Sequence, residues 1–223
     1  MVELKSNRQT WDFSNCAVIV AHPDDETLWA GGTILANPMT RWTVISLCRK
    51  SDPDRASKFL AAVEALGASG VIGDLEDGPE QKPLNERDIE KMIMSLLPTS
   101  RFDVVLTHSV WGEYTKHIRH EETAKAVLSL WKAGQLLAKQ IWAFAYEDGS
   151  GRYLPRPVKA ADIYKWLPKD IVQKKYDIIT KIYGFASESW EAKTTPKMEA
   201  FWQFKVEGGS PGNVRKPQNG VEK

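Results

Sequence analysis

The sequence predicts an α/β fold in which a Rossmann-like, mostly parallel, doubly wound sheet is flanked by helices. Short apolar runs, typical of buried strands, alternate with segments of helical periodicity as far as about Gly149. Clusters of polar residues directly follow two of these runs, where ligands collect in open α/β sheets. A length of 223 residues suits one domain of this kind.

Five strands and four helices are expected in alternation. The strands are expected at residues 16–21, 42–48, 70–73, 102–108 and 139–147. The helices are expected at residues 25–36, 53–67, 85–98 and 121–134. The first helix begins with acids, which suit the positive N-terminal end of a helix. Pro53 is typical of a first helical turn, and Gly67, Pro98 and Gly134 mark helix ends.

The pattern changes after Gly149. Residues 149–157 have the composition of a loop, and residues 169–186 have the periodicity of a long amphipathic helix. The last residues are polar and rich in glycine and proline, which is typical of flexible segments. We therefore expect a single α/β domain over residues 1–204 and a flexible tail over residues 205–223.

Composition limits the partners and the compartment. The chain carries 30 Lys and Arg against 29 Asp and Glu, whereas nucleic-acid-binding domains have a basic excess. No apolar run is long enough to span a membrane, and the first residues lack an apolar signal core. Cys16 and Cys48 lie in apolar strand-like runs, which favours a reduced, cytoplasmic location over a disulfide framework. The expected partner is a small molecule, and association into a homo-oligomer is left open.

Residues that carry chemistry follow the first and the fourth expected strand. The segment AHPDDE follows the first strand and holds His22, Asp24 and Asp25. The segment THSVWGEYTKHIRHEE follows the fourth strand and holds the other three histidines of the chain, which are His108, His117 and His120. Both segments are expected at the same edge of the sheet. All four histidines of the chain therefore fall in two clusters at strand ends.

This combination suits a catalytic zinc ion, which keeps three protein ligands and one position for water. His22, Asp25 and one histidine of the HIRH segment would supply the ligands. Asp24 need not bind the metal and could accept a proton from the attacking water as a general base. Taken alone, each residue has an ordinary role as a turn, a helix cap or, for His108, a hydrogen-bonded strand end. Those roles do not explain the concentration of histidines, so the sequence predicts a metal site.

Together, the two clusters resemble the LmbE-like (PIG-L) family of metal-dependent de-N-acetylases, over roughly residues 16–146. Members of that family remove acetyl groups from N-acetylglucosamine conjugates and related amides, usually with zinc, on a Rossmann-like fold. The metal ligands that the resemblance implies are His22, Asp25 and His120. It implies Asp24 as the base and His117 as a residue that stabilises the developing oxyanion. The expected ion is Zn²⁺, and other divalent metals such as Fe²⁺ are compatible.

The resemblance also implies three contacts to an amino-sugar conjugate, which are made by Arg55, Asp77 and Tyr114. The chain departs from the family pattern near the last of these. Many members have Gly-Tyr-Gly-His-Pro-Asp-His, whereas Thr115 and Lys116 separate Tyr114 from His117 here. Lys58 stands where a glutamate is common after the arginine, so substrate contacts are expected to differ.

Other functions fit parts of the pattern. An amidase acting on a related sugar conjugate, or a non-catalytic protein that keeps the metal to bind carbohydrate, would carry the same ligands. Two histidines and a carboxylate also describe iron(II) oxygenases, but those sites lie on barrel or sandwich folds. No G-x-G-x-x-G follows the first strand, which disfavours a dinucleotide-binding protein. Three tryptophans near strand ends either line a sugar pocket or pack in the core, and they are Trp29, Trp111 and Trp142.

Overall fold

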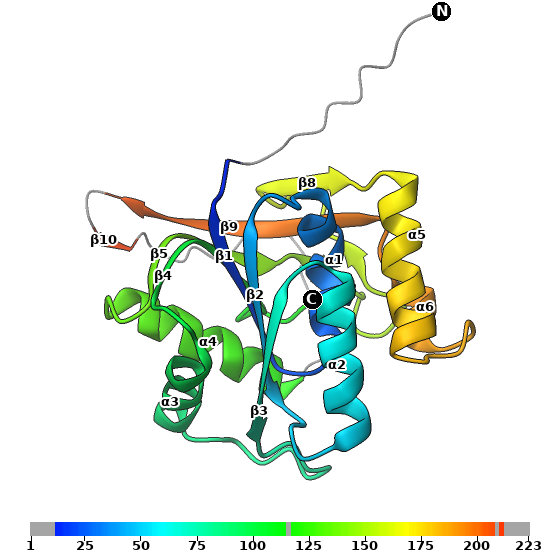
Figure 1. Cartoon of the computed structure of the whole chain (residues 1–223). Helices are drawn as coiled ribbons and strands as arrows, with labels where there is room; N and C mark the ends of the chain where they lie inside the picture. The colour runs from blue at the N-terminus through cyan, green and yellow to red at the C-terminus, as the bar shows by residue number, and fades with distance from the viewer. Residues whose placement is uncertain (1–11, 115–116, 208–209, 212–223) are drawn as a thin grey trace, which may run out of the picture.

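The sheet at the centre of the computed structural model is mostly parallel, as the sequence predicts. The described residues are 12–114, 117–207 and 210–211. The strands of the sheet are β1 (Asn15–Val20), β2 (Arg41–Cys48), β3 (Ser69–Leu75), β4 (Arg101–Thr107), β5 (Leu137–Phe144), β8 (Ile163–Trp166), β9 (Met198–Glu207) and β10 (Ser210–Pro211). Their order is β10-β9-β5-β4-β1-β2-β3, with β8 also paired to β9 (Figure 1). Strands β1 to β5 run parallel, and β9 is antiparallel to β5.

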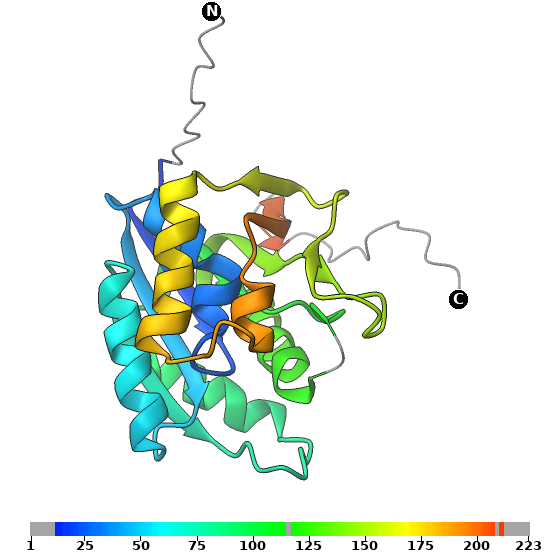
Figure 2. The same ribbon diagram turned by 90° about the vertical axis from the view of Figure 1, so that its right-hand side faces the viewer.

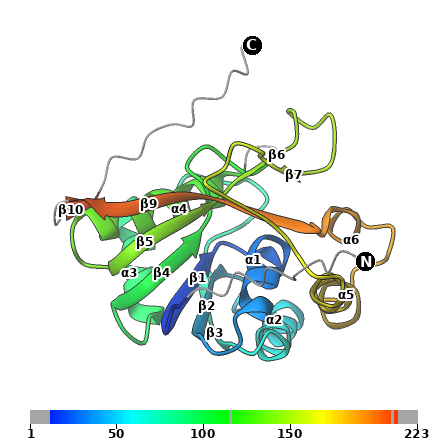
Figure 3. The same cartoon turned by 90° about the horizontal axis from the view of Figure 1, so that it is seen from above.

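Helices cover both faces of this sheet. The helices are α1 (Asp25–Ala36), α2 (Pro53–Ala65), α3 (Glu86–Leu96), α4 (Ile118–Lys132), α5 (Lys169–Asp177) and α6 (Trp190–Thr194). Figures 1 and 3 show α1, α2 and α5 on one side of the sheet and α3 and α4 on the other. Helix α5 packs against α1. In Figure 2, α5 is the yellow helix in front. None of the described helices is long and apolar enough to cross a membrane.

Strand β1 shows how the sequence produces two cores. Its side chains alternate in direction, so Val18 and Val20 join the core under α1 and α2, while Ala17 and Ile19 join the core under α3 and α4. All four side chains are fully buried. A central parallel strand covered on both faces is apolar throughout, which explains the continuous run AVIV.

Most predicted elements agree with the structure to within two residues at each end, and three differ by more than that. Helix α4 begins at Ile118, three residues before the expected start, so His120 lies in its first turn. The expected strand at 139–147 is divided into β5 and β6 (Tyr146–Glu147), and β6 pairs with β7 (Arg156–Pro157) to form a hairpin. The expected helix at 169–186 is α5 followed by a π-helical turn over Ile178–Ile182.

Strands β8 and β9 were not predicted. Strand β9 is the antiparallel neighbour of β5, and β8 pairs with its first half. The expected boundary between the domain and the tail, at residue 205, lies inside β9. The expected flexible tail falls largely on residues 208–209 and 212–223, outside the described part of the chain, and its flexibility stays a prediction.

A buried ion pair connects the C-terminal elements to α1. Glu199 on β9 accepts hydrogen bonds from the backbone N–H groups of Gly32 (2.8 Å) and Thr33 (2.7 Å) within α1. Lys175 on α5 donates to the same carboxylate at 2.7 Å, and neither charged side chain is exposed. A Cβ atom at Gly32 would lie 2.9 Å from Glu199 Oε1 and closer still to Leu167, so only glycine permits this approach.

We expect a Glu199→Ala variant to lose about 3–5 kcal/mol of unfolding free energy, because Lys175 would remain as an uncompensated buried charge. Urea denaturation of the two proteins measures this difference. The matched control is Glu188→Ala, which breaks the exposed pair with Lys193 and should change stability by less than about 0.5 kcal/mol. Equal effects of the two substitutions would contradict this account of the buried pair.

Candidate metal centre

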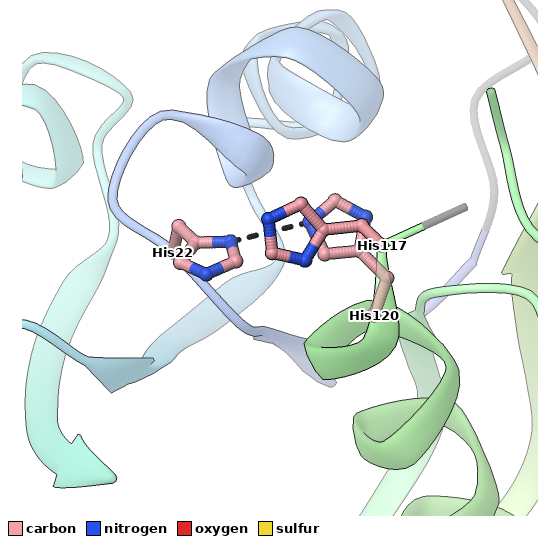
Figure 4. A group of neighbouring side chains, drawn as sticks. All are labelled: His22, His117 and His120. Carbon is pink, nitrogen blue, oxygen red and sulfur yellow. Dashed lines mark hydrogen bonds between the residues drawn. The ribbon is translucent and has the colours of Figure 1, made fainter. Parts of the chain in front are cut away.

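The two predicted clusters meet because β1 and β4 are neighbouring parallel strands. The chain leaves β1 at Val20 and places His22 in the loop that leads to α1. The chain that follows β4 enters α4, whose first turn carries His120 and whose N-cap is His117. Figure 4 shows His22 facing these two histidines across the site. The predicted convergence of the two segments at one sheet edge is therefore present.

Three donor atoms form a nearly equilateral triangle. His22 Nδ1 lies 3.2 Å from His120 Nε2 and 3.3 Å from Asp25 Oδ2. His120 Nε2 lies 3.3 Å from Asp25 Oδ2. Ligands placed tetrahedrally at about 2.0–2.1 Å from a zinc ion are separated by about 3.3–3.4 Å. The residues present therefore fit a metal ion held by these three atoms.

The carboxylate of Asp25 is fixed in this arrangement. Its Oδ1 accepts a hydrogen bond from Trp29 Nε1 at 3.1 Å, and its Oδ2 accepts one from the backbone N–H of His22 at 3.0 Å. Burial raises the pKa of Asp25, but the neighbouring His120 and His108 hold it well below the ordinary value. The carboxylate is therefore in the ionised form that a metal ligand requires.

Glu113 bridges two of the buried histidines. Its Oε2 lies 3.2 Å from His120 Nδ1, and its Oε1 lies 3.2 Å from His108 Nδ1 and 2.6 Å from the backbone nitrogen of Ser109. Burial raises the pKa of Glu113, but the two histidines lower it to about 2. With Nδ1 of His120 bound to a carboxylate, its Nε2 is directed into the donor triangle, which is the usual arrangement of a metal-binding histidine.

His108 takes part in this network without joining the triangle. Its Nε2 accepts a hydrogen bond from the backbone N–H of Ala21 at 3.0 Å, so its lone pair is already used. It lies 3.5 Å from Asp25 Oδ2. Burial and the nearby His120 lower its pKa, which favours the neutral ring. His108 is therefore a hydrogen-bonded residue after the strand end, which is the ordinary role that the sequence suggests for it.

Asp77 lies against His22. Its Oδ1 is 3.2 Å from His22 Nε2, just outside hydrogen-bond geometry, and it accepts a hydrogen bond from Gln81 Nε2 at 2.9 Å. Its Oδ2 pairs with Arg49 Nη2 at 2.6 Å. Cys48 lies near the same group, but burial raises the pKa of its thiol to about 12, which makes it a poor ligand at neutral pH. The contact of Asp77 with a sugar stays a prediction.

Asp24 occupies an unusual backbone conformation at φ 105° and ψ −30°. Its N–H donates to Glu26 Oε2 at 3.0 Å, and its Oδ2 accepts a hydrogen bond from Arg55 Nη1 at 3.2 Å. Burial, together with the charges of Asp25 and Glu26, raises its pKa well above the ordinary value. The carboxyl group of Asp24 is therefore less acidic here than that of an ordinary aspartate.

His117 and Tyr114 border the same space. The His117 ring lies 4.6 Å from those of His22 and His120, and no described residue bonds its Nδ1. Burial and the two histidines lower its pKa to about 4, so the ring is neutral and able to donate from one nitrogen. Tyr114 stacks on Trp29 with ring centroids 5.6 Å apart and packs against Trp190 at 5.1 Å.

Two adjoining cavities open at this edge of the sheet. The first, about 450 Å³, is lined by most of the predicted residues, which are His22, Asp24, Asp25, Arg55, Asp77, Tyr114 and His117. His120 lies behind this lining and is almost fully buried. The second, about 600 Å³, is bordered by the β6–β7 hairpin and shares Tyr114, Trp190 and Glu191 with the first. A cavity of about 720 Å³ lies at the opposite end of the strands, and no histidine lines it among the described residues.

Several residues that contact the predicted set were given no role in the site from the sequence. They are Glu26, Arg49, Glu113, Tyr183 and Trp190. Glu26 stands in AHPDDE and Glu113 stands between two histidines, and these positions were signals of a role for both carboxylates. Of the three tryptophans considered, Trp29 and Trp142 are buried, and Trp111 packs against the core under α3 and α4. Core packing is therefore their role, although Trp29 also positions Asp25.

Comparisons with known proteins address the fold and the family. Residues 17–131, more than half of the chain, match the PIG-L family model, described as GlcNAc-PI de-N-acetylase. Protein L374 of Acanthamoeba polyphaga mimivirus, which is uncharacterized, is 25% identical over 179 residues, covering 73% of this chain and 75% of the viral one.

Two solved structures illustrate the range of activities on this fold. N,N'-diacetylchitobiose deacetylase from Pyrococcus horikoshii is similar with a TM-score of 0.65 at 15% identity, over 86% of this chain and 84% of that chain. GalB, the 4-carboxy-2-hydroxymuconate hydratase from Pseudomonas putida, is similar with a TM-score of 0.55 at 20% identity, over 82% of each chain. At these identities the similarity shows a common fold.

Proposed function

Because this chain belongs to the PIG-L family of GlcNAc-PI de-N-acetylases, we propose that it is a metal-dependent hydrolase that removes the N-acetyl group from an amino-sugar conjugate. The products are acetate and a free amine. The observation that carries the proposal is the triangle of His22 Nδ1, Asp25 Oδ2 and His120 Nε2, with sides of 3.2–3.3 Å. Its spacing matches three ligands of a tetrahedral ion, and two of the three residues, His22 and Asp25, also line the first cavity.

These three residues are the proposed metal ligands. We expect the metal to be Zn²⁺, with Fe²⁺ as the other candidate. When bound, such an ion polarises a carbonyl group and makes water acidic near neutral pH. Two carboxylates orient the ligands: Glu113 lies against His120 Nδ1, and Asp77 lies near His22 Nε2.

Asp24 acts as the general base in this proposal. It takes a proton from the attacking water and later passes that proton to the leaving nitrogen. Its place in the lining of the cavity, with its carboxylate beside Arg55, supports the role. His117 donates a hydrogen bond to the oxyanion that develops on the former carbonyl, which its neutral ring and its position on the cavity wall allow.

The second cavity supports a conjugate as the substrate, as opposed to a free amino sugar. It continues from the first past Tyr114 and Trp190, and the side chain of Trp190 remains 38% exposed at the junction. If the acetamido group lies near the metal ligands in the first cavity, the second cavity provides room for the remainder of the substrate. Arg55 and Tyr114 are the proposed sugar contacts, since both line the first cavity.

We expect a Trp190→Ala variant to lose about tenfold in kcat/KM for an N-acetylated disaccharide, because the exposed ring at the junction provides contact area. Steady-state amine release measures the loss. The matched control is Trp166→Ala, which removes another exposed tryptophan, on β8. Equal kcat/KM values for Trp190→Ala and the parent protein would rule out the junction as part of the substrate site.

The function itself is tested by assaying amine release from N-acetylglucosamine, its β-linked disaccharide and lipid-linked or aromatic conjugates. We expect metal-dependent release of amine from at least one conjugate. The hydratase among the structural neighbours shows that this fold also accommodates the substrate of a hydratase. Metal-loaded protein that leaves every amide intact would contradict the proposal and direct attention to such substrates or to a binding role.

A further inference from the structure

The conformation of Asp24 requires support from its surroundings. Its φ of 105° lies in the left-handed region that favours glycine, where a side chain is strained. Such a residue keeps its conformation only when its neighbours hold it there. Since Asp24 is the proposed base, whatever holds its backbone also determines where its carboxylate lies.

Glu26 provides one such contact. Its Oε2 accepts the hydrogen bond from the backbone N–H of Asp24 at 3.0 Å. Its Oε1 accepts hydrogen bonds from Tyr183 Oη at 2.8 Å and from Thr27 Oγ1 at 2.5 Å. The side chain of Glu26 is fully buried, so these protein groups fix both of its oxygens. The hydroxyl of Tyr183 is the one member of this set that comes from outside α1 and its cap.

The π-helical turn determines where Tyr183 lies. The backbone N–H of Tyr183 donates to the carbonyl of Ile178 at 3.0 Å, a spacing of five residues. One extra residue in a helical turn rotates every following side chain by about 100° relative to an α-helix. Ile178 and Ile179 remain buried in the core, while Tyr183 reaches Glu26. Gly184, at φ 79°, then ends the helical segment in a conformation that glycine adopts without strain.

Phe185, the residue after this glycine, is connected to Asp24 through Arg55. The guanidinium of Arg55 lies over the ring of Phe185, 5.3 Å from its centroid. The same guanidinium donates to Asp24 Oδ2 at 3.2 Å. Both the backbone and the carboxylate of Asp24 are therefore connected to the segment that follows the π-helical turn. That segment lies outside residues 17–131, the part of the chain that matches the family model.

We propose that Tyr183 is a positioning residue that fixes the backbone of Asp24 through the carboxylate of Glu26. The inference rests on the proposed function only for its effect on catalysis. Its structural content, that the hydroxyl of Tyr183 holds the Asp24 N–H in its hydrogen bond, does not depend on which reaction the protein performs.

The test compares Tyr183→Phe with Tyr146→Phe. Both substitutions remove one buried hydroxyl and keep the ring, but Tyr146 Oη lies near the backbone carbonyls of Trp29 and Met198 and does not contact Glu26. The first measurement is the hydrogen-exchange rate of the Asp24 amide by NMR in metal-free protein. The second set of measurements is kcat and KM of the metal-loaded protein, together with the zinc affinity of the metal-free protein.

We expect the Asp24 amide to exchange about tenfold faster in Tyr183→Phe than in Tyr146→Phe. We also expect kcat to fall about tenfold in Tyr183→Phe alone, with KM and zinc affinity close to the parent values. Unchanged exchange at Asp24, or equal acceleration in the two variants, would overturn the inference. If the parent protein hydrolyses no amide, the proposed function fails, and the exchange rates still decide the role of Tyr183.

Discussion

An Asp24→Asn variant is expected to bind its metal normally and to lose about 10²–10⁴-fold in kcat. The amide keeps the size of the carboxylate and can still accept a hydrogen bond from Arg55, so the site should retain its shape. It cannot take a proton from water, and a positioned general base contributes a factor of this size. Asp24 does not belong to the donor triangle, so the metal content should remain at the parent level.

Metal content by elemental analysis and steady-state kinetics on the same preparations test this expectation. The matched control is Asp54→Asn, which changes an exposed aspartate at the start of α2 that pairs with Lys58. Its kinetics should equal those of the parent protein. Full activity in Asp24→Asn would remove Asp24 as the base, whereas loss of metal from that variant would place Asp24 among the ligands.

A His120→Ala variant is expected to lose the metal itself. The substitution removes Nε2 from the triangle and leaves only His22 Nδ1 and Asp25 Oδ2 to hold the ion. It also leaves the buried carboxylate of Glu113 with one histidine partner in place of two. Zinc affinity should therefore fall by more than the roughly 10–100-fold that is typical when a carboxylate behind a metal-binding histidine is removed.

Competition with a chromophoric chelator measures this affinity. Glu113→Gln is the intermediate comparison, because it keeps all three donor atoms and weakens the contacts that orient His120 and His108. We expect its affinity to lie between those of the parent protein and His120→Ala. Parent-like zinc affinity in His120→Ala would show that the metal is held elsewhere, such as at His22, Cys48 and Asp77.

The sequence is sufficient for the parallel part of the fold. Strands β1 to β5 are apolar runs bounded by helices, and each local pattern agrees with its place in the sheet. The start of α4 is less clear, because its N-cap is His117 and not one of the usual capping residues. The π-helical turn at Ile178–Ile182 could not be predicted, because an amphipathic α-helical pattern does not reveal one inserted residue.

In the candidate site, too, some features could be predicted from local sequence patterns and others could not. The proximity of the proposed ligands could be predicted because neighbouring parallel strands bring their carboxyl ends together, and because every histidine followed one of two strands. The contacts that orient these residues were missed because they depend on distant pairings. Tyr183 and Glu26 are 157 residues apart in the chain, and no local pattern connects them. Strand β9 was missed for the same reason, since its partner β5 ends more than fifty residues earlier.

The most direct test of the central claim is a zinc titration of metal-free protein, followed by the initial rate of acetate release from an N-acetylated disaccharide. The account predicts no release without metal, a linear rise as zinc is added, and a plateau at one ion per chain. Fe²⁺ added in the same way determines which ion supports the higher rate. Release that is equally fast without metal, or protein that binds one zinc per chain and releases no acetate from any conjugate, would contradict a metal-dependent deacetylase.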